Sequence, residues 1–229
     1  MKRSLLATVS LVVLTAATAP SRAASPVFNW TGCYVGGHVG YGWGKTDFTD
    51  AQSGFFVYPF GSISTDPHGL LGGAQVGCNY QFAPMWVVGL TGTLSIADIS
   101  GNVVSGFFST PVDFKTDWLG SVAARVGYSW DHWLVYAKGG AAFAHNKYSA
   151  TNYIGTFDAS ETRAGWTVGA GLEWAFANDW SAMLEYAFYD FGTQDITLAT
   201  AASYPPSTES VKFQTQTIMF GVNYHFNIH

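Results

Sequence analysis

The feature that most constrains the fold is a two-residue period in residues 165–192. On either side of the short segment 177–179, large apolar side chains alternate with small or polar ones, and the apolar set includes Trp166, Trp174 and Trp180. A period of two is typical of a β-strand, because successive side chains of a strand point to opposite faces. The stretch therefore predicts two antiparallel strands that are joined by a tight turn and share a wholly apolar face.

The same period recurs along the chain and predicts eight strands in all. Besides the hairpin at 165–192, the strands cover 31–43, 69–82, 86–96, 117–130, 133–143 and 212–226. Connections of two or three residues follow the second, fourth and sixth strands. The other connections are long and rich in Gly, Ser, Thr, Asp and Pro, and they lie near 44–68, 97–116, 145–162 and 192–211.

This alternation of short and long connections is typical of an outer-membrane barrel. The sequence therefore predicts an all-β fold, an eight-stranded antiparallel transmembrane β-barrel with short periplasmic turns and four long extracellular loops. An even number of strands places both termini in the periplasm. A secreted β-sandwich is the alternative fold. A lipocalin-like barrel is excluded, because its apolar side chains would point inward.

The N-terminus has the pattern of a secretory signal peptide. A basic start at Lys2 and Arg3 precedes an apolar run, and small residues stand at Ser21 and Ala23. We expect residues 1–23 to be removed and residues 24–229 to form one barrel domain. Three of the ten basic residues lie in the signal peptide, which leaves seven against fifteen acidic ones and argues against nucleic acid as a partner.

The tryptophans cluster at the predicted ends of the strands, with none in the middle. Since Trp prefers the interface between membrane and water, this placement supports a membrane-spanning barrel. The predicted interface aromatics at the short-turn end are Trp30, Trp86, Trp130, Trp133, Trp174 and Trp180.

Four charges fall on the inward face of successive strands, namely Arg125, Lys138, Glu173 and Glu185. Buried charges are stable only when they are paired, and the interior of an eight-stranded barrel is about filled by side chains. We therefore predict that the two glutamates neutralise the two cations and plug the lumen. A narrow ion path is the alternative.

Two cysteines, Cys33 and Cys78, share the outward face of the first two strands. If Trp43 lies opposite His68, the same register places Cys33 opposite Cys78. Directly opposed residues approach the geometry that a disulfide needs, and the periplasm is oxidising. The alternative is two free thiols that act as small hydrophobic side chains against lipid.

Catalysis finds little support, because no Ser-His-acid or metal-ligand spacing emerges among the six histidines. We predict a protein that is not an enzyme and has no resident metal or cofactor. His68 and His145 at the outer rim are candidate haem contacts, since His can ligate haem iron. The acidic outer loops suit lipopolysaccharide phosphates bridged by divalent cations.

Three stretches, 28–37, 165–175 and 184–190, resemble the small alphaproteobacterial outer-membrane β-barrel family, which is related to opacity proteins and the OmpA-like transmembrane domain. The resemblance implies a Gram-negative outer-membrane protein that supports the envelope or interacts at the cell surface. Its partners would be outer-membrane lipids, the barrel-assembly machinery and a host surface or haem. The sequence departs from the family at Cys33 and Cys78, where an aromatic residue is usual, and at its non-aromatic C-terminus. A haem-binding protein, a narrow porin-like channel and a lipid-modifying barrel enzyme stay open as alternatives.

Overall fold

The computed structural model describes residues 28–50, 62–104, 111–152, 155–198 and 207–226. The described residues form strands and tight turns, and they contain no helix that is long and apolar enough to cross a membrane. The predicted signal peptide, 1–23, lies outside the described residues and stays a prediction, as does the boundary at residue 24. The strands are β1 (Gly32–Asp50), β2 (Ser62–Thr65), β3 (His68–Ala83), β4 (Trp86–Val104), β5 (Pro111–Trp130), β6 (Trp133–Asn152), β7 (Gly155–Ala177), β8 (Trp180–Leu198) and β9 (Ser207–Phe226).

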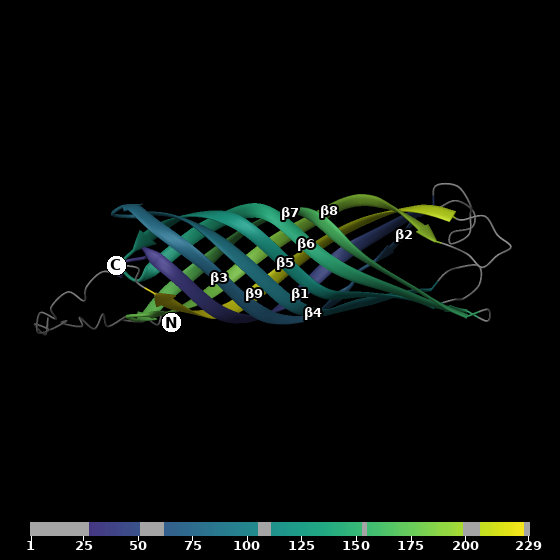
Figure 1. Cartoon of the computed structure of the whole chain (residues 1–229), viewed down its shortest axis with the longest axis horizontal. Coiled ribbons are helices and arrows are strands. Elements are labelled where there is room, and N and C mark those ends of the chain that lie inside the picture. The colour runs from purple at the N-terminus through teal and green to yellow at the C-terminus, as the bar shows by residue number, and fades with distance from the viewer. Residues whose placement is uncertain (1–27, 51–61, 105–110, 153–154, 199–206, 227–229) are drawn as a thin grey trace, which may run out of the picture.

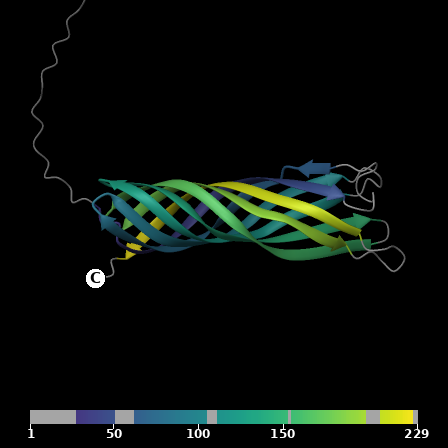
Figure 2. The same cartoon turned by 90° about the horizontal axis from the view of Figure 1, so that it is seen from above.

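The nine strands form one antiparallel sheet in the order β2-β1-β3-β4-β5-β6-β7-β8-β9, and an additional pairing of β1 with β9 closes it. The short strand β2 pairs only with β1, so it lies outside the closed ring. The other eight strands make a twisted, elongated barrel (Figures 1 and 2). The predicted all-β, eight-stranded antiparallel barrel is confirmed.

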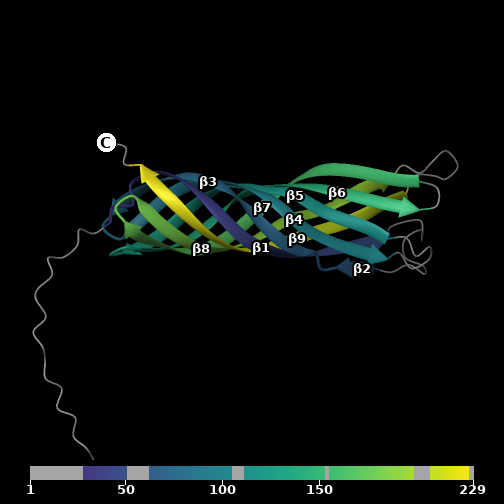
Figure 3. The same ribbon diagram turned by 90° about the horizontal axis from the view of Figure 1, so that it is seen from below.

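Three tight turns mark one end of the barrel, which we call the turn end. Each turn has two residues, between the pairs Ala83 and Trp86, Trp130 and Trp133, and Ala177 and Trp180. β1 begins and β9 finishes at this same end, as Figure 3 shows. We call the opposite end the loop end.

The strands run further toward the loop end than the sequence predicts. β4 and β5 stay paired up to Val104 and Pro111, and β6 and β7 up to Asn152 and Gly155. The prediction of long loops over 97–116, 145–162 and 192–211 is therefore wrong, because most of each range belongs to a strand. Beyond the membrane neither face of a strand has to be apolar, so the alternation that reveals a strand in the sequence disappears.

The outer face is apolar and the inner face is filled. Large outward side chains are widely exposed, with 65% for Val39, 71% for Leu70 and 78% for Ile96. In the lumen, one apolar cluster near the turn end contains Trp30, Val87, Leu134, Tyr136 and Ala175. Two more apolar clusters lie toward the loop end. The larger contains Leu119, Ala142, Ala144, Ala187, Tyr189, Phe191 and Phe213. The smaller contains Leu71, Ala97, Ile99 and Met219.

Candidate functional site

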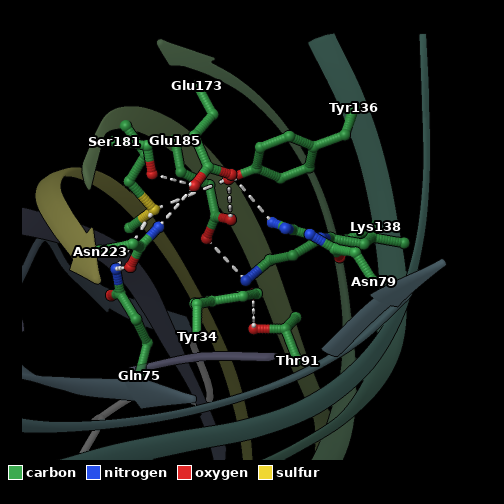
Figure 4. A network of polar contacts seen from close by, with 12 residues as sticks. Tyr34, Gln75, Asn79, Thr91, Tyr136, Lys138, Glu173, Ser181, Glu185 and Asn223 are labelled. Carbon is green, nitrogen blue, oxygen red and sulfur yellow. Dashed lines mark hydrogen bonds and ion pairs between the residues drawn. The ribbon is translucent and has the colours of Figure 1, made fainter. Parts of the chain in front are cut away.

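The four predicted interior charges lie together in the lumen. The register of β5 and β6 sets Arg125 directly opposite Lys138. Arg125 Nη1 lies 3.2 Å from Glu173 Oε2. Lys138 Nζ lies 2.6 Å from Glu185 Oε1, as Figure 4 shows. Like charges on opposed residues destabilise a sheet, and here each cation instead has its own carboxylate from β7 or β8. All four residues are at most 5% exposed.

The Arg125 guanidinium lies between two aromatic rings. Its Cζ atom is 4.7 Å from the ring centre of Tyr34 and 4.9 Å from that of Tyr136, distances at which cation–π attraction operates. The Nε–H of Arg125 donates to Asn79 Oδ1 at 2.7 Å. The planar group is thus held by its faces as well as by its edges.

The two carboxylates accept further hydrogen bonds. Ser181 Oγ donates to Glu173 Oε1 at 2.6 Å, and Asn223 Nδ2 donates to the same oxygen at 2.7 Å. The Tyr136 hydroxyl donates to Glu185 Oε2 at 2.8 Å. Hydrogen bonds to an ionised group are about twice as strong as neutral ones, so these donors help to hold both charges in the lumen.

Neutral side chains extend the arrangement to the remaining strands. Gln75 Nε2 donates to Asn223 Oδ1 at 2.6 Å, and Gln75 Oε1 lies 2.6 Å from His38 Nδ1. His38 Nε2 lies 2.7 Å from Ser95 Oγ. We call this set the interior network, and its members come from all eight strands of the ring: Tyr34, His38, Gln75, Asn79, Ser95, Arg125, Tyr136, Lys138, Glu173, Ser181, Glu185 and Asn223.

The sequence predicts the charged members of the interior network and the inward direction of its neutral members, but not which of them bond to one another. Gln75 and Asn79 alternate with apolar residues, so their inward direction is visible in the sequence. Nothing in the sequence indicates that Ser181 and Asn223 both bond to Glu173. Only the strand register, which places them directly opposite each other, reveals it.

Trp30 corrects the predicted set of interface aromatics. It is fully buried in the lumen, on the turn side of the interior network. Its ring centre lies 4.7 Å from that of Phe28 and 5.8 Å from that of His225. Its position has the same parity as the inward residue Tyr34, and its backbone N–H donates to Gln81 Oε1 at 3.1 Å. Trp30 therefore caps the lumen and does not contact the interface.

The other five predicted interface tryptophans lie on the outer face at the turn end. Trp86, Trp130, Trp174 and Trp180 are 45–47% exposed, and the Trp133 ring stacks on Trp174 with 5.7 Å between ring centres. This is the position that a girdle of interfacial aromatic residues requires.

Cys33 and Cys78 are joined by a disulfide with an Sγ–Sγ distance of 2.02 Å. The register of β1 and β3 pairs Cys33 with Cys78 and Trp43 with His68, which is the register that makes a disulfide possible in the sequence. Both cysteines belong to the outward set of their strands.

The two candidate haem contacts are not brought together. His68 lies on β3 and His145 on β6, so β4 and β5 separate them, roughly 14 Å apart at the usual strand spacing. Each has local contacts on the outer face. His68 Nδ1 lies 3.2 Å from the Asp66 carbonyl oxygen, and the His145 ring stacks on Trp118. Among the described residues, no group of three His, Cys, Asp or Glu side chains could hold a metal ion.

Just beyond Trp118, the loop end carries exposed ion pairs on its outer face. Lys115 Nζ lies 2.9 Å from Asp98 Oδ1, and Lys147 Nζ lies 2.7 Å from Asp117 Oδ2. The hydrogen bond from Lys147 lowers the pKa of Asp117, and the hydrogen bond to Asp98 raises the pKa of Lys115. The register sets the two lysines directly opposite each other.

A closed antiparallel barrel with an apolar exterior and a filled polar interior defines the class of transmembrane β-barrel proteins of outer membranes. The family model described as the outer membrane protein beta-barrel domain matches residues 9–226 of the sequence. The chain therefore belongs to the outer membrane β-barrel family, and its location in the outer membrane follows.

Relatives in two bacterial genera support this assignment. The 31 kDa outer-membrane immunogenic protein of Brucella melitensis biotype 1 is 32% identical, over 94% of this chain and 91% of the relative. The 22 kDa outer membrane protein of Rhizobium leguminosarum bv. viciae is 33% identical, over 76% of this chain and 70% of the relative. The resemblance to an alphaproteobacterial barrel family is confirmed.

Among solved structures, the outer membrane protease OmpT from Escherichia coli matches with a TM-score of 0.55 at 8% identity. The match covers 88% of this chain and 99% of the protease chain. At this identity the likeness shows the fold alone.

Proposed function

We propose that this protein is a closed, non-conducting and non-enzymatic barrel that contributes to the integrity of the outer membrane. The interior network is the observation that carries the proposal. In the part of the chain that the structure describes, each of its two cations is paired with a carboxylate of the protein, so these four side chains offer a permeating ion no unpaired charge to bind. Ion-selective pores instead present rings of charged side chains or carbonyl groups to the ion.

The apolar clusters add to this argument. Trp30 and its neighbours fill the lumen on the turn side of the network, and Phe191 and Phe213 pack in the lumen on the loop side, with 5.3 Å between ring centres. An ion that crossed the lumen would have to displace both apolar layers and break buried salt bridges. The removal of one partner from a buried pair costs about 3–5 kcal/mol.

We also propose that the turn end faces the periplasm and the loop end faces the cell exterior. Both termini of the described barrel lie at the turn end, as expected for a chain that is exported and then inserted from the periplasmic side. An epitope inserted between Asn152 and Gly155 should be accessible to antibody on intact cells. The same epitope inserted between Asn178 and Asp179 should become accessible only after the outer membrane is permeabilised, and the opposite result would reverse the orientation.

Outer-membrane lipids, lipopolysaccharide and the barrel-assembly machinery are the partners that fit this location. Lys115 and Lys147 lie just beyond the Trp118 ring, at the level where lipid headgroups carry phosphate. Asp98 and Asp117 supply the oxygen ligands that divalent cations accept. Treatment with a chelator should reduce the lipopolysaccharide that copurifies with the barrel, and unchanged copurification would argue against cation bridging.

A deletion strain tests the proposed role in the envelope. Loss of the protein should increase sensitivity to sodium dodecyl sulfate, and wild-type protein supplied in trans should restore resistance. The Glu173→Ala variant should restore less resistance than Leu184→Ala, a matched change on the lipid face. Unchanged detergent sensitivity in the deletion strain would refute a contribution to envelope integrity.

A further inference from the structure

The Cys33–Cys78 disulfide lies on the face of the barrel that lipid covers. On one side Cys33 pairs with Phe226 of β9, and on the other Cys78 pairs with Leu90 of β4. The next outward residue along β3 is Val76. In the protein alone, Phe226, Leu90 and Val76 are 46%, 64% and 55% exposed, so lipid and not bulk water covers this region in the membrane.

Disulfide exchange needs a solvated cysteine thiolate. The attacking species is a thiolate, and a charged sulfur surrounded by hydrocarbon loses its solvation without gaining a partner. The cysteine thiolate must also approach a sulfur of a soluble oxidant in line with the oxidant S–S bond that breaks, so the oxidant has to reach the cysteine. In the inserted barrel, lipid covers both sulfurs and excludes such an oxidant.

We propose that this disulfide forms before the barrel inserts, by exchange with a water-soluble disulfide oxidant in the periplasm. One cysteine thiolate attacks the oxidant disulfide, which forms a mixed disulfide and releases the first oxidant thiolate. The second cysteine thiolate attacks the mixed disulfide at the sulfur of its partner, which forms the Cys33–Cys78 bond and releases the second oxidant thiolate. The chain loses two electrons and two protons, and the oxidant becomes a dithiol.

Oxidation before insertion affects how β1 pairs with its neighbours, because of where the disulfide lies. At the turn end, two-residue turns connect β3 to β4, β5 to β6 and β7 to β8, whereas β1 has no turn to either neighbour. The disulfide supplies the missing covalent link between β1 and β3 near that end. A chain oxidised beforehand enters the membrane with the β1–β3 register fixed, and the pairing of β1 with β9 is then the seam that closes last.

Folding in vitro tests the order of the two steps. The reduced chain is folded into dilauroylphosphatidylcholine vesicles, and oxidised glutathione is added at pH 8. Thiol loss should be at least tenfold slower than for the same reduced chain in urea. As an access control, Asn178→Cys in a background lacking both native cysteines should react rapidly in the vesicles. Oxidation of Cys33 and Cys78 at similar rates in vesicles and in urea would overturn the proposal.

A second measurement covers the case in which the reduced chain does not fold. The oxidised barrel in the same vesicles is treated with the charged reductant tris(2-carboxyethyl)phosphine, and reduction should again be at least tenfold slower than in urea. In cells, chains trapped in the periplasm by a slowed barrel-assembly machinery should already carry the disulfide. Trapped chains that are reduced, beside inserted chains that are oxidised, would show that oxidation follows insertion.

Discussion

The two faces of the barrel wall follow different rules, although they alternate residue by residue along the same strands. On β7, the inward Glu173 is fully buried with partners on three other strands, while its neighbour Trp174 on the outer face is 45% exposed. The stability contributed by the inner face depends on specific pairs of polar residues. The stability contributed by the outer face depends only on apolar side chains in contact with lipid. A substitution therefore changes the free energy of unfolding by a different amount on each face.

The largest expected effect breaks the inner face alone. Glu173→Ala leaves the Arg125 guanidinium buried without its carboxylate, and we expect a loss of about 3–5 kcal/mol in the free energy of unfolding. Leu184→Ala removes a lipid-facing side chain of comparable size and should cost roughly 1–2 kcal/mol. Urea unfolding in vesicles measures both variants. Equal losses of unfolding free energy in the two variants would mean that the interior ion pair contributes no more to stability than a lipid-facing leucine.

The next prediction tests the outer face with a charge. Val39 is 65% exposed near the middle of the membrane-spanning part of β1, so Val39→Arg should cost about 2–4 kcal/mol. Val39→Ala at the same position should cost less, because it leaves the lipid face apolar. The same vesicle assay measures both. If arginine is tolerated as well as alanine, this face does not contact hydrocarbon.

Two tyrosines allow the contribution of a single hydroxyl group to stability to be compared between the inner and the outer face. Tyr136 donates to the Glu185 carboxylate inside, and Tyr186 donates to the neutral Gln216 amide oxygen outside at 2.7 Å. We expect Tyr136→Phe to cost about 1.5–3 kcal/mol and Tyr186→Phe about 0.5–1.5 kcal/mol. Urea midpoints at equal slopes give the difference, and a reversed order would contradict the contrast.

The smallest expected effect lies where the wall leaves the membrane. Lys147→Ala removes the hydrogen bond that lowers the pKa of Asp117, so the pKa should rise toward its usual range. Because the folded pKa of this carboxyl is depressed, the stabilisation it provides is present above the unfolded pKa and is lost as the pH falls through the folded pKa. Carboxyl NMR titration in detergent micelles checks the shift, with Lys45→Ala as the control, and an unmoved Asp117 titration would show that the pair does not form in solution.

The sequence predicts the barrel because period-two alternation is strong wherever one face meets lipid, as in the hairpin at 165–192. It also predicts that Arg125, Lys138, Glu173 and Glu185 point inward, but it does not predict that Arg163 on β7 is fully buried. It does not predict the extension of β6 to Asn152, since beyond the membrane no apolar face remains to mark the strand. It misplaces Trp30, because a tryptophan near a strand end suits both the interface and the lumen, and only packing against Leu134 and Ala175 decides between them.

Partners within the lumen are the least visible from sequence. Gln75 and Asn223 lie 148 residues apart in the chain, and their contact depends on closure of the whole ring. The distance between two strands along the sequence does not predict which of their polar side chains form hydrogen bonds. A register shift of either strand by one residue would turn its own side chain to the lipid face.

Single-channel recording in a planar bilayer tests the central claim most directly. The folded wild-type barrel, with its interior network and apolar clusters in place, should give no stable conductance steps in symmetric potassium chloride. Large, steady steps from the folded wild-type protein would contradict a sealed lumen.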